Sequence, residues 1–366
     1  MFTAIAGGIL VLATLWDAFE TIVLPRRVTR RFRWTRMVFR LTWVPWAFIA
    51  RRIPQRQRQG MLGIFGPLSL IFLLSSWALG LLFGFALLHF GSGSHLIAPH
   101  QATGFGTDLY LSGTTLFTLG PGDVIPATAF TRFLLVLEAG TGLGFFAIII
   151  GYFPVVYQSF SRREVAISLL DARAGSPPSA VELLRRQAAT GRSEDLAELF
   201  KEWETWAAEL MESHLSYPVL TYYRSQHSNQ SWLAALAALL DASALMVACG
   251  EGRCRRQAEL TFAMARHLLV DLAQVLGRPP LHHAEDRLPA GSLTETEAIL
   301  LHAGIELHFD QAALRELHRL RALYEPYLQA LSHYLLFPLP GWLPVRKSDN
   351  WQTTAWNQVG RKVMED

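Results

Sequence analysis

Residues 114–123 read Thr-Thr-Leu-Phe-Thr-Leu-Gly-Pro-Gly-Asp and lie between two long apolar segments of the chain. The stretch predicts a short helix followed by a loop with the pattern Thr-x-Gly-x-Gly-Asp. In a soluble protein this pattern would indicate only a turn. Here an apolar span precedes it and a second apolar span with several glycines follows it, which favours a loop that enters a membrane. A loop that only turns at the membrane surface is the alternative.

The arrangement resembles the pore loop of the two-transmembrane potassium channels, whose filter usually reads Thr-Val-Gly-Tyr-Gly-Asp. The resemblance covers residues 61–160. It implies an all-α membrane protein of the pore-loop type, in which backbone carbonyls of four such loops replace the water of the permeating ion. It therefore implies a homotetramer that holds K⁺ in its filter and has no resident cofactor or metal.

The resemblance also assigns the ion-binding residues. They are Thr118, Leu119, Gly120, Pro121, Gly122 and Asp123. Glycine permits the alternating backbone signs that inward-pointing carbonyls require, and the hydroxyl of Thr118 can add an oxygen at the inner end. The preceding helix would direct its partially negative carbonyl end toward the pore axis.

Pro121 departs from the family pattern, because Tyr or Phe is usual at this position. Proline keeps its carbonyl oxygen, and its fixed φ is tolerated in an extended loop. The aromatic ring that braces the filter in the family is lost. We therefore expect cations to permeate, with a weaker preference for potassium over sodium than the family norm.

The composition indicates a membrane protein. Hydrophobic residues make up 51% of the 366 residues and charged residues 17%, whereas soluble proteins have about 25% charged residues. Between Gly60 and Thr131 the chain has no Lys or Arg. Three spans are predicted, at residues 2–24, 61–90 and 132–158.

The distribution of charge predicts the topology. Eleven arginines and no acid lie in one segment: Arg26, Arg27, Arg30, Arg31, Arg33, Arg36, Arg40, Arg51, Arg52, Arg56 and Arg58. The positive-inside rule places this segment on the cytoplasmic side, so the filter faces out and the C-terminal half is cytoplasmic, at the inner (plasma) membrane. From Ser161 onward there are 21 basic and 25 acidic residues, which argues against a nucleic-acid partner.

The Arg26–Arg58 segment contains an apolar patch at residues 37–50 with two tryptophans. This composition is typical of a helix that lies in the interface on anionic lipid; a re-entrant segment is the alternative. Two acids, Asp17 and Glu20, lie one helical turn apart near the same end of the first span. They predict either an ion or proton relay or, as we favour, pairing with nearby arginines.

Gly140, Gly142 and Gly144 interrupt the last predicted span. They indicate either close packing of helices or a gating hinge. The resemblance assigns the hinge to Gly140, and Pro154 would add a second kink.

We expect three domains: an N-terminal helix with the arginine-rich segment (1–60), the pore domain (61–160) and a helical cytoplasmic domain (161–366). In the last, helical periodicity predicts helices at about 179–190, 194–215, 231–249, 252–276, 293–308 and 311–336, with breaks that include Pro326. Capping boxes are predicted for Ser179 with Glu182 and for Thr294 with Glu297. Residues 232–248 are apolar enough to be a fourth span, but Asp241 at their centre favours a buried bundle helix.

No motif for an enzyme stands out. The histidines have no metal-ligand spacing, Cys249 and Cys254 are expected to be free thiols, and the polar, aromatic residues 222–227 would either bind a ligand or cap a bundle. The sequence thus favours a tetrameric cation channel with a regulatory or assembly domain. A non-conducting receptor or scaffold that keeps the pore fold is the alternative.

Overall fold

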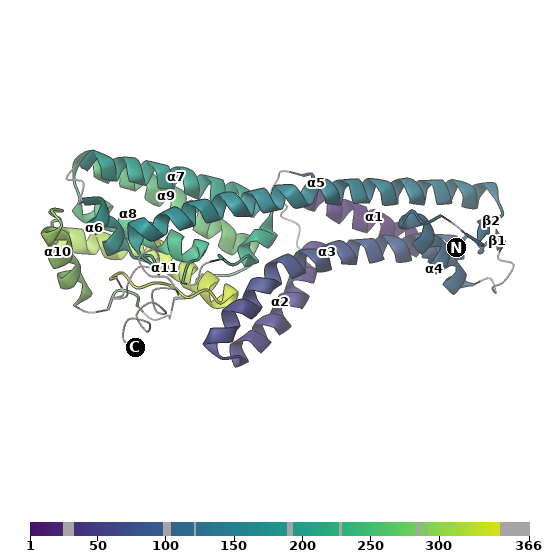
Figure 1. Cartoon of the computed structure of the whole chain (residues 1–366), viewed down its shortest axis with the longest axis horizontal. Helices are drawn as coiled ribbons and strands as arrows, with labels where there is room; N and C mark the ends of the chain where they lie inside the picture. The colour runs from purple at the N-terminus through teal and green to yellow at the C-terminus, as the bar shows by residue number, and fades with distance from the viewer. Residues whose placement is uncertain are drawn as a thin grey trace, which may run out of the picture. The chain divides into compact units, whose positions relative to one another are not determined.

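The computed structural model describes residues 1–24, 33–97, 104–120, 122–188, 193–226, 229–282, 286–289 and 291–344. The described residues form, in order, α1 (Phe2–Ile22), α2 (Trp34–Arg52), α3 (Gln55–Gly91), β1 (Leu96–Ile97), α4 (Phe105–Leu116), β2 (Ile125–Pro126), α5 (Ala129–Ala174), α6 (Ala180–Ala188), α7 (Ser193–Ser216), the 3₁₀ turn η1 (Pro218–Tyr222), α8 (Trp232–Cys249), α9 (Gly252–Val275), α10 (Ser292–His302) and α11 (Gln311–Leu335) (Figure 1). The chain is therefore an all-α membrane protein, as predicted.

The contacts divide the chain into two compact units, Met1–Gln158 and Ser159–Asp366. Helix α5 contributes to both. The finer division of the first unit at residue 60 stays a prediction.

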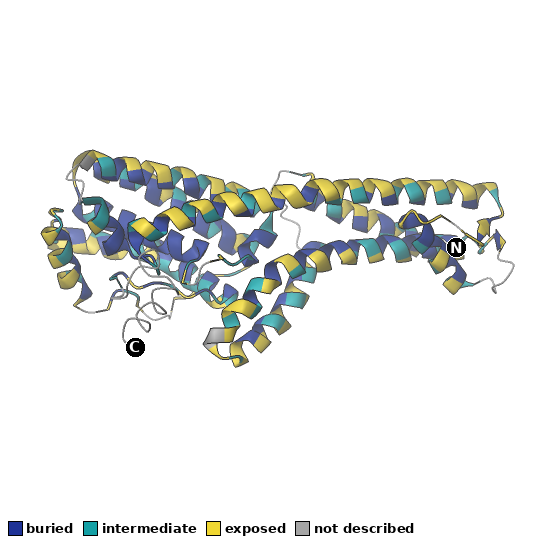
Figure 2. Cartoon of the chain, viewed as in Figure 1, coloured by how far each residue is buried: buried dark blue, intermediate teal, exposed yellow. Residues whose placement is uncertain are grey.

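Among the described residues, four helices are long and apolar enough to cross a membrane: α1, most of α3, α5 and α8. The first three coincide with the predicted spans. In α8, 94% of the apolar window is buried inside the protein, and the helix contacts α6, α7, α9 and α11; Figure 2 shows it almost entirely in the colour of buried residues. Protein covers α8 on all sides, which favours a central bundle helix over a fourth span.

Glycines bring α1 and α3 into contact backbone to backbone. A Cβ atom on Gly7 would lie 2.6 Å from the carbonyl oxygen of Gly84, and one on Gly80 would lie 2.6 Å from Oγ1 of Thr14. Small residues at such spacing let apolar helices approach closely. Because Gly7 meets Gly84 while Thr14 meets Gly80, the two helices run antiparallel.

Asp17 fixes the start of α2 rather than pairing with an arginine. Its Oδ2 atom accepts hydrogen bonds from the backbone N–H of Thr35 (3.1 Å), from Oγ1 of Thr35 (2.6 Å) and from Nε1 of Trp77 (3.0 Å). The first N–H groups of a helix have no partner within the helix, so a buried carboxylate from α1 satisfies one of them. The expected arginine partner of Asp17 is not among these contacts, and Glu20 accepts from Nε1 of Trp16 (2.7 Å).

Helix α2 has one buried face and one exposed apolar face. Trp43 on the buried face contacts Phe65 of α3, with ring centroids 4.7 Å apart. The other face exposes Met37, Leu41, Val44, Phe48 and Ile49. Arg58 donates to the carbonyls of Ala50 (3.0 Å) and Ile53 (3.3 Å), so it caps the end of α2.

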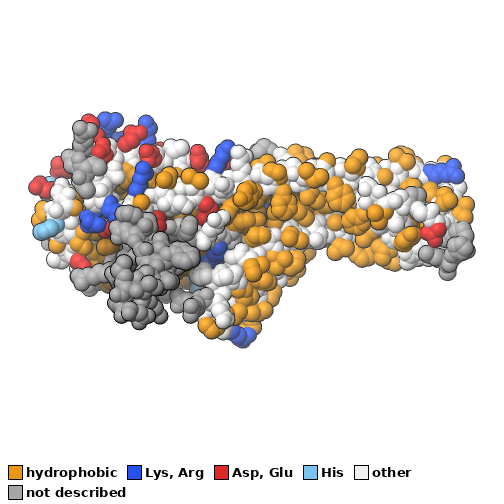
Figure 3. All heavy atoms as spheres, in the orientation of Figure 1, with side chains coloured by type: hydrophobic (Ala, Val, Ile, Leu, Met, Phe, Trp, Pro, Cys, Tyr) orange, Lys and Arg blue, Asp and Glu red, His pale blue; other side chains and the backbone are white. Residues whose placement is uncertain are grey.

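Helix α5 has 46 residues and, at about 1.5 Å per residue, it is much longer than the apolar core of a bilayer is thick. It continues without a break through Gly140 and Pro154. Its first half exposes large apolar side chains, namely Phe130, Phe133, Val136, Leu137, Leu143, Ile148, Ile150, Phe153, Val155 and Tyr157. Figure 3 shows hydrophobic side chains gathered over the elements of the first unit, while charged ones lie mainly over the second.

The helices of the second unit agree with the predicted ranges to within a few residues, with three exceptions. Helix α10 ends at His302 rather than near 308, because Gly304 leaves the helix with φ +83°. The cap of α10 is Gly291, so the predicted Thr294 capping box is wrong, and Pro326 lies inside α11 without ending it. The other predicted box is present, since Oγ of Ser179 accepts the N–H of Glu182 (3.2 Å).

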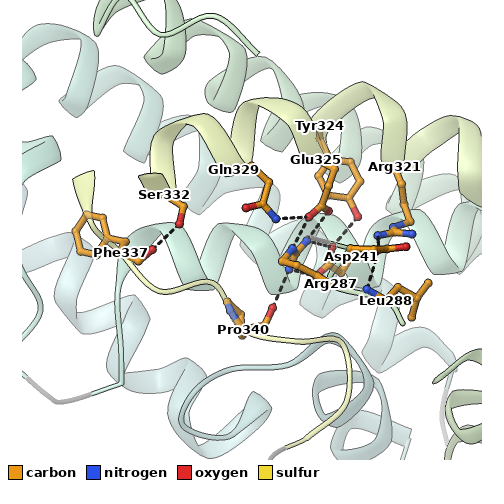
Figure 4. Close-up of polar contacts among 11 residues, drawn as sticks. Asp241, Arg287, Leu288, Arg321, Tyr324, Glu325, Gln329, Ser332, Phe337 and Pro340 are labelled. Carbon is orange, nitrogen blue, oxygen red and sulfur yellow. Dashed lines mark hydrogen bonds and ion pairs between the residues drawn. The ribbon is translucent and has the colours of Figure 1, made fainter. Parts of the chain in front are cut away.

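A buried ion cluster holds the loop before α10 against α8 and α11 (Figure 4). Arg287 donates to Asp241 Oδ1 (2.7 Å) and to Glu325 Oε1 (2.6 Å), and Tyr324 donates to the same Asp241 oxygen (2.6 Å). Burial alone would lower the pKa of Arg287, but the two carboxylates outweigh it and raise the pKa well above its usual value. The arginine is therefore charged and holds two buried acids together.

A second buried arginine ties the end of α5 to the bundle. Arg163 is 3% exposed and donates to the carbonyls of Leu220 (2.9 Å) and Tyr223 (3.1 Å), while His214 lies 3.2 Å from its guanidinium. Burial first, and then the charge of Arg163, lower the pKa of His214 well below its usual value.

The stretch that begins at Tyr222 caps helices in its described part. Arg224 donates to the carbonyls of Leu336 (3.1 Å) and Leu335 at the end of α11, and the hydroxyls of Tyr222 and Tyr334 are 2.9 Å apart. These contacts favour the capping interpretation over a ligand site; His227 lies outside the described residues.

We expect Arg287→Met to lower the free energy of unfolding of the second unit by about 3–5 kcal/mol, because it leaves two buried carboxylates without their counter-charge. Denaturant unfolding of the full chain in detergent measures the change. Arg319→Met is the matched control: Arg319 pairs with Glu316 on the surface and is 60% exposed, so its loss should cost about 0.5 kcal/mol or less. Equal losses in the two variants would contradict a stabilising role of the cluster.

We expect the stability of the second unit to fall as the pH drops below about 6.5. The unfolded chain then binds a proton at His214 that the folded chain excludes. The free energy of unfolding therefore falls by at most about 1.4 kcal/mol for each pH unit. His214→Gln should remove this contribution, whereas replacement of the exposed His302 by Gln should keep it. Unfolding free energies between pH 5 and 8 test this, and the same slope in wild type and His214→Gln would contradict it.

Candidate functional site

The segment before the short helix α4 pairs with the segment after the candidate filter. Strands β1 and β2 pair antiparallel, with Leu96 opposite Pro126 and Ile97 opposite Ile125. Leu96, Leu111 and Val124 form a small buried cluster under the ribbon. The segments before α4 and after the candidate filter are thereby joined, which fixes the start and the end of the loop.

The loop has a positive φ at three of its described residues, Thr118, Gly120 and Gly122. Thr118 has φ +58°, Gly120 +91° and Gly122 +55°, whereas Leu119 has no positive φ. A positive φ is unusual for threonine and costs about 1–2 kcal/mol. Pro121 lies outside the described residues. Alternation of this kind is what allows successive carbonyls to face one side.

The loop begins tightly wound on the last turn of α4. The backbone N–H groups of Leu119 (2.8 Å) and Gly120 (3.2 Å) both donate to the carbonyl oxygen of Thr114. The side chain of Leu119 is 78% exposed, and Thr118, Gly120, Gly122 and Asp123 are exposed as well. The candidate ion-binding residues that the structure describes are thus all exposed on the single chain.

Of the glycines at positions 140, 142 and 144 in α5, the structure gives a packing role to Gly142. A Cβ atom there would lie 2.3 Å from the carbonyl oxygen of Leu116, the last residue of α4. Gly140 and Gly144 have nothing within 4 Å of such an atom. Gly142 is therefore the position at which the end of the short helix packs on α5. The hinge at Gly140 and Pro154 stays a prediction.

The sequence did not single out two further residues near the loop. The hydroxyl of Tyr110 on α4 lies 3.5 Å from where a Cβ of Gly122 would be, so an aromatic residue of the short helix reaches the filter. Phe117 lies against Phe146 of α5, with centroids 6.1 Å apart. The only signal in the sequence was that these residues are aromatic. The spacing of Tyr110 and Gly122, or of Phe117 and Phe146, does not predict that they lie close together.

The part of the chain that the structure describes offers no metal site besides the loop. That part holds no group of three or more His, Cys, Asp or Glu side chains that could bind a metal ion. Cys249 and Cys254 are buried and free.

We expect Gly142→Ala to lower the free energy of unfolding by about 1–3 kcal/mol, because the new methyl group overlaps the carbonyl of Leu116. The helix propensity of alanine offsets at most about 1 kcal/mol of this loss. Gly144→Ala is the control, since it gains the propensity without the overlap and should be neutral or stabilising. Thermal unfolding in detergent compares the two, and equal midpoints would contradict the close contact.

Comparison with known proteins agrees with this geometry. Residues 72–159 match the family model described as "Ion channel". An uncharacterized membrane protein of Bacillus subtilis (strain 168), YdjJ, is 22% identical over 241 residues, which cover 65% of this chain and 69% of that protein. No solved structure matches the chain. The matched segment contains the end of α3, the short helix, the glycine-rich loop and the first part of α5, so this part of the chain is similar to the family described as "Ion channel".

Proposed function

We propose that the chain is the subunit of a tetrameric cation channel that conducts potassium, with its filter at Thr118, Leu119, Gly120, Pro121, Gly122 and Asp123. The observation that carries the proposal is the alternation of positive φ at Thr118, Gly120 and Gly122. It directs backbone carbonyls, which replace the hydration shell of a cation in pores of this kind. Permeant K⁺ is the only ion the proposal needs, and no resident cofactor is part of it.

A single loop supplies only part of a ring of oxygens, so the proposal includes four copies around one axis. The exposed apolar side chains of α5 support it. In one chain only 22% of the apolar window of α5 is buried, and neighbouring copies together with lipid would cover the rest.

We place the second unit in the cytoplasm, in a protein of the plasma membrane, because arginines dominate the segment between α1 and α3, which includes α2. There it would regulate or assemble the channel. The buried contacts of Arg163 support this role, since they attach the end of α5 firmly to the bundle. Gly140 and Pro154 are the proposed points at which α5 bends during gating.

Anionic lipid is the proposed partner of the Arg26–Arg58 segment. Helix α2 supports it with an exposed apolar face and with the exposed arginines Arg36, Arg40, Arg51 and Arg52. Arg58 caps α2, so we leave it out of the lipid contact. Residues 25–32 of the segment lie outside the described residues.

A non-conducting receptor or scaffold remains the second candidate, and Pro121 is the residue that favours it. Loss of the aromatic brace would weaken the filter even if the fold is kept. Tyr110 beside Gly122 supports the conducting alternative, because it supplies an aromatic side chain at the loop from another element.

Single-channel recording of the purified protein in planar bilayers tests the proposal, and a mass measurement in detergent tests the tetramer. We expect cation currents, no chloride current, and a reversal potential that responds to both potassium and sodium gradients. Pro121→Tyr should shift the reversal potential toward the potassium value, because the ring braces the loop. Absence of cation current from a stable tetramer would favour the scaffold, and a reversal potential set by potassium alone would contradict the effect assigned to Pro121.

A further inference from the structure

Two ionisable side chains are in contact between α3 and α5, and a third is buried on the short helix α4. Nε2 of His89 on α3 lies 3.2 Å from Oε2 of Glu138 on α5, and both side chains are completely buried. Asp108 on α4 is also completely buried, and its Oδ2 accepts a hydrogen bond from Oγ of Ser94 (2.6 Å). The contact of His89 with Glu138 thus joins α3 to α5, and a second buried acid lies on α4.

These side chains are not fully satisfied by the protein. Nδ1 of His89, Oδ1 of Asp108 and Oε1 of Glu138 are buried and have no partner among the described atoms. A buried polar atom without a partner costs about 1–3 kcal/mol, and more if it is charged. The three side chains do not form a group that could hold a metal ion. A proton is the remaining ligand that changes the charge of the cluster and gives Nδ1 a hydrogen to donate.

The charge balance also favours a bound proton. With a neutral imidazole the cluster holds two buried carboxylates and no cation, which is costly in an apolar interior. Asp108 lies in the first turn of α4 and its Oδ2 accepts a hydrogen bond from Ser94. The exchangeable proton is assigned to the His89–Glu138 pair, because these two side chains are in direct contact at 3.2 Å.

Other charged groups on the surrounding elements are engaged elsewhere. At this end of α3 the amino terminus of α1 donates to the carbonyl of Gly91 (3.5 Å). Arg132 at the start of α5 donates to the carbonyl of Pro126 (3.4 Å), and His95 is exposed in the outer loop. None of these contacts reaches the cluster.

The cluster lies one helical turn from the contact between Gly142 of α5 and the end of α4. Glu138 and Gly142 are four residues apart on α5, and Ser112 and Leu116 are four residues apart on α4, so each pair lies on one helix face. Ser112 is beside Glu138, and Leu116 contacts Gly142. Helices α4 and α5 therefore approach each other at two successive turns. One turn of α5 contains Glu138, and the next contains Gly142, against which the residue before the candidate filter loop packs.

We infer that His89, Asp108 and Glu138 form a proton-binding site that links α3, α4 and α5 and makes conduction depend on the external pH. The inference rests on the proposed channel function. With the proton bound, His89 attracts both carboxylates and holds α4 on α5. Without it, the two carboxylates repel each other and the turn beside Gly142 loosens, so the filter loses its support.

Cation flux from potassium-loaded liposomes, measured between pH 5 and 8.5 outside, tests the inference. Imidazoles change charge between about pH 5 and 8, so wild-type flux should fall about fivefold or more across this range as the pH rises. His89→Gln should abolish the dependence, and the exposed control His95→Gln should retain it. Equal pH dependence in wild type and His89→Gln would overturn the inference.

Two further measurements keep the test decisive. If His89→Gln fails to assemble, Asp108→Asn replaces it: loss of a neighbouring anion weakens proton binding, so half-maximal flux should move to lower pH, and an unchanged midpoint would overturn the site. Wild-type flux without any pH dependence would overturn the site and leave the channel standing. Absence of flux at every pH would overturn the proposed function, and the site is then judged by thermal unfolding in detergent, where wild type and His89→Gln should differ in pH dependence and identical profiles would overturn it.

Discussion

The contact between Gly142 and the carbonyl of Leu116 is the constraint on which the pore segment depends. It fixes the height at which α4 ends on α5, and the filter loop begins at that point. A hydrogen atom is the largest substituent that fits between the two backbones. Polar groups of a helix end buried in an apolar medium need partners, and Thr114 supplies its carbonyl to two amides of the loop. The loop can therefore be strained at Thr118 because its start is held so firmly.

The helices follow from the sequence because their signals are local, whereas the filter role of residues 118–123 stays a prediction. Apolar runs without charge define α1, α3 and α5, and helical periodicity defines the bundle of the second unit to within a few residues. The role of Gly142 could not be predicted, since three glycines at alternate positions look alike until α4 lies against one of them. The positive φ of Thr118 was missed for a related reason, because threonine gives no local sign of it. His89 and Glu138 are 49 residues apart, and only the meeting of α3 with α5 makes them a pair.

An acid within an apolar helix predicts that the fold supplies a partner for it, but not which partner, as two such acids show. Asp17 in α1 and Asp241 in α8 each lie in a run that is apolar enough to span a membrane. Asp241 is matched by Arg287 from a distant loop, as a bundle interior requires, whereas Asp17 binds the start of α2 and the indole of Trp77. The sequence predicts that each acid needs a partner, but the partner's identity depends on which chain segments the fold brings near it.

The position of Asp17 has a consequence for how the protein is made. During synthesis α1 leaves the ribosome before α2 and α3, and its carboxylate then has none of the three donors that it binds in the finished fold. An unmatched acid in an apolar helix is costly in lipid. The contacts of Asp17 are complete only once Trp77, sixty residues later, is in place, so α1 depends on α3 for one partner of its buried acid.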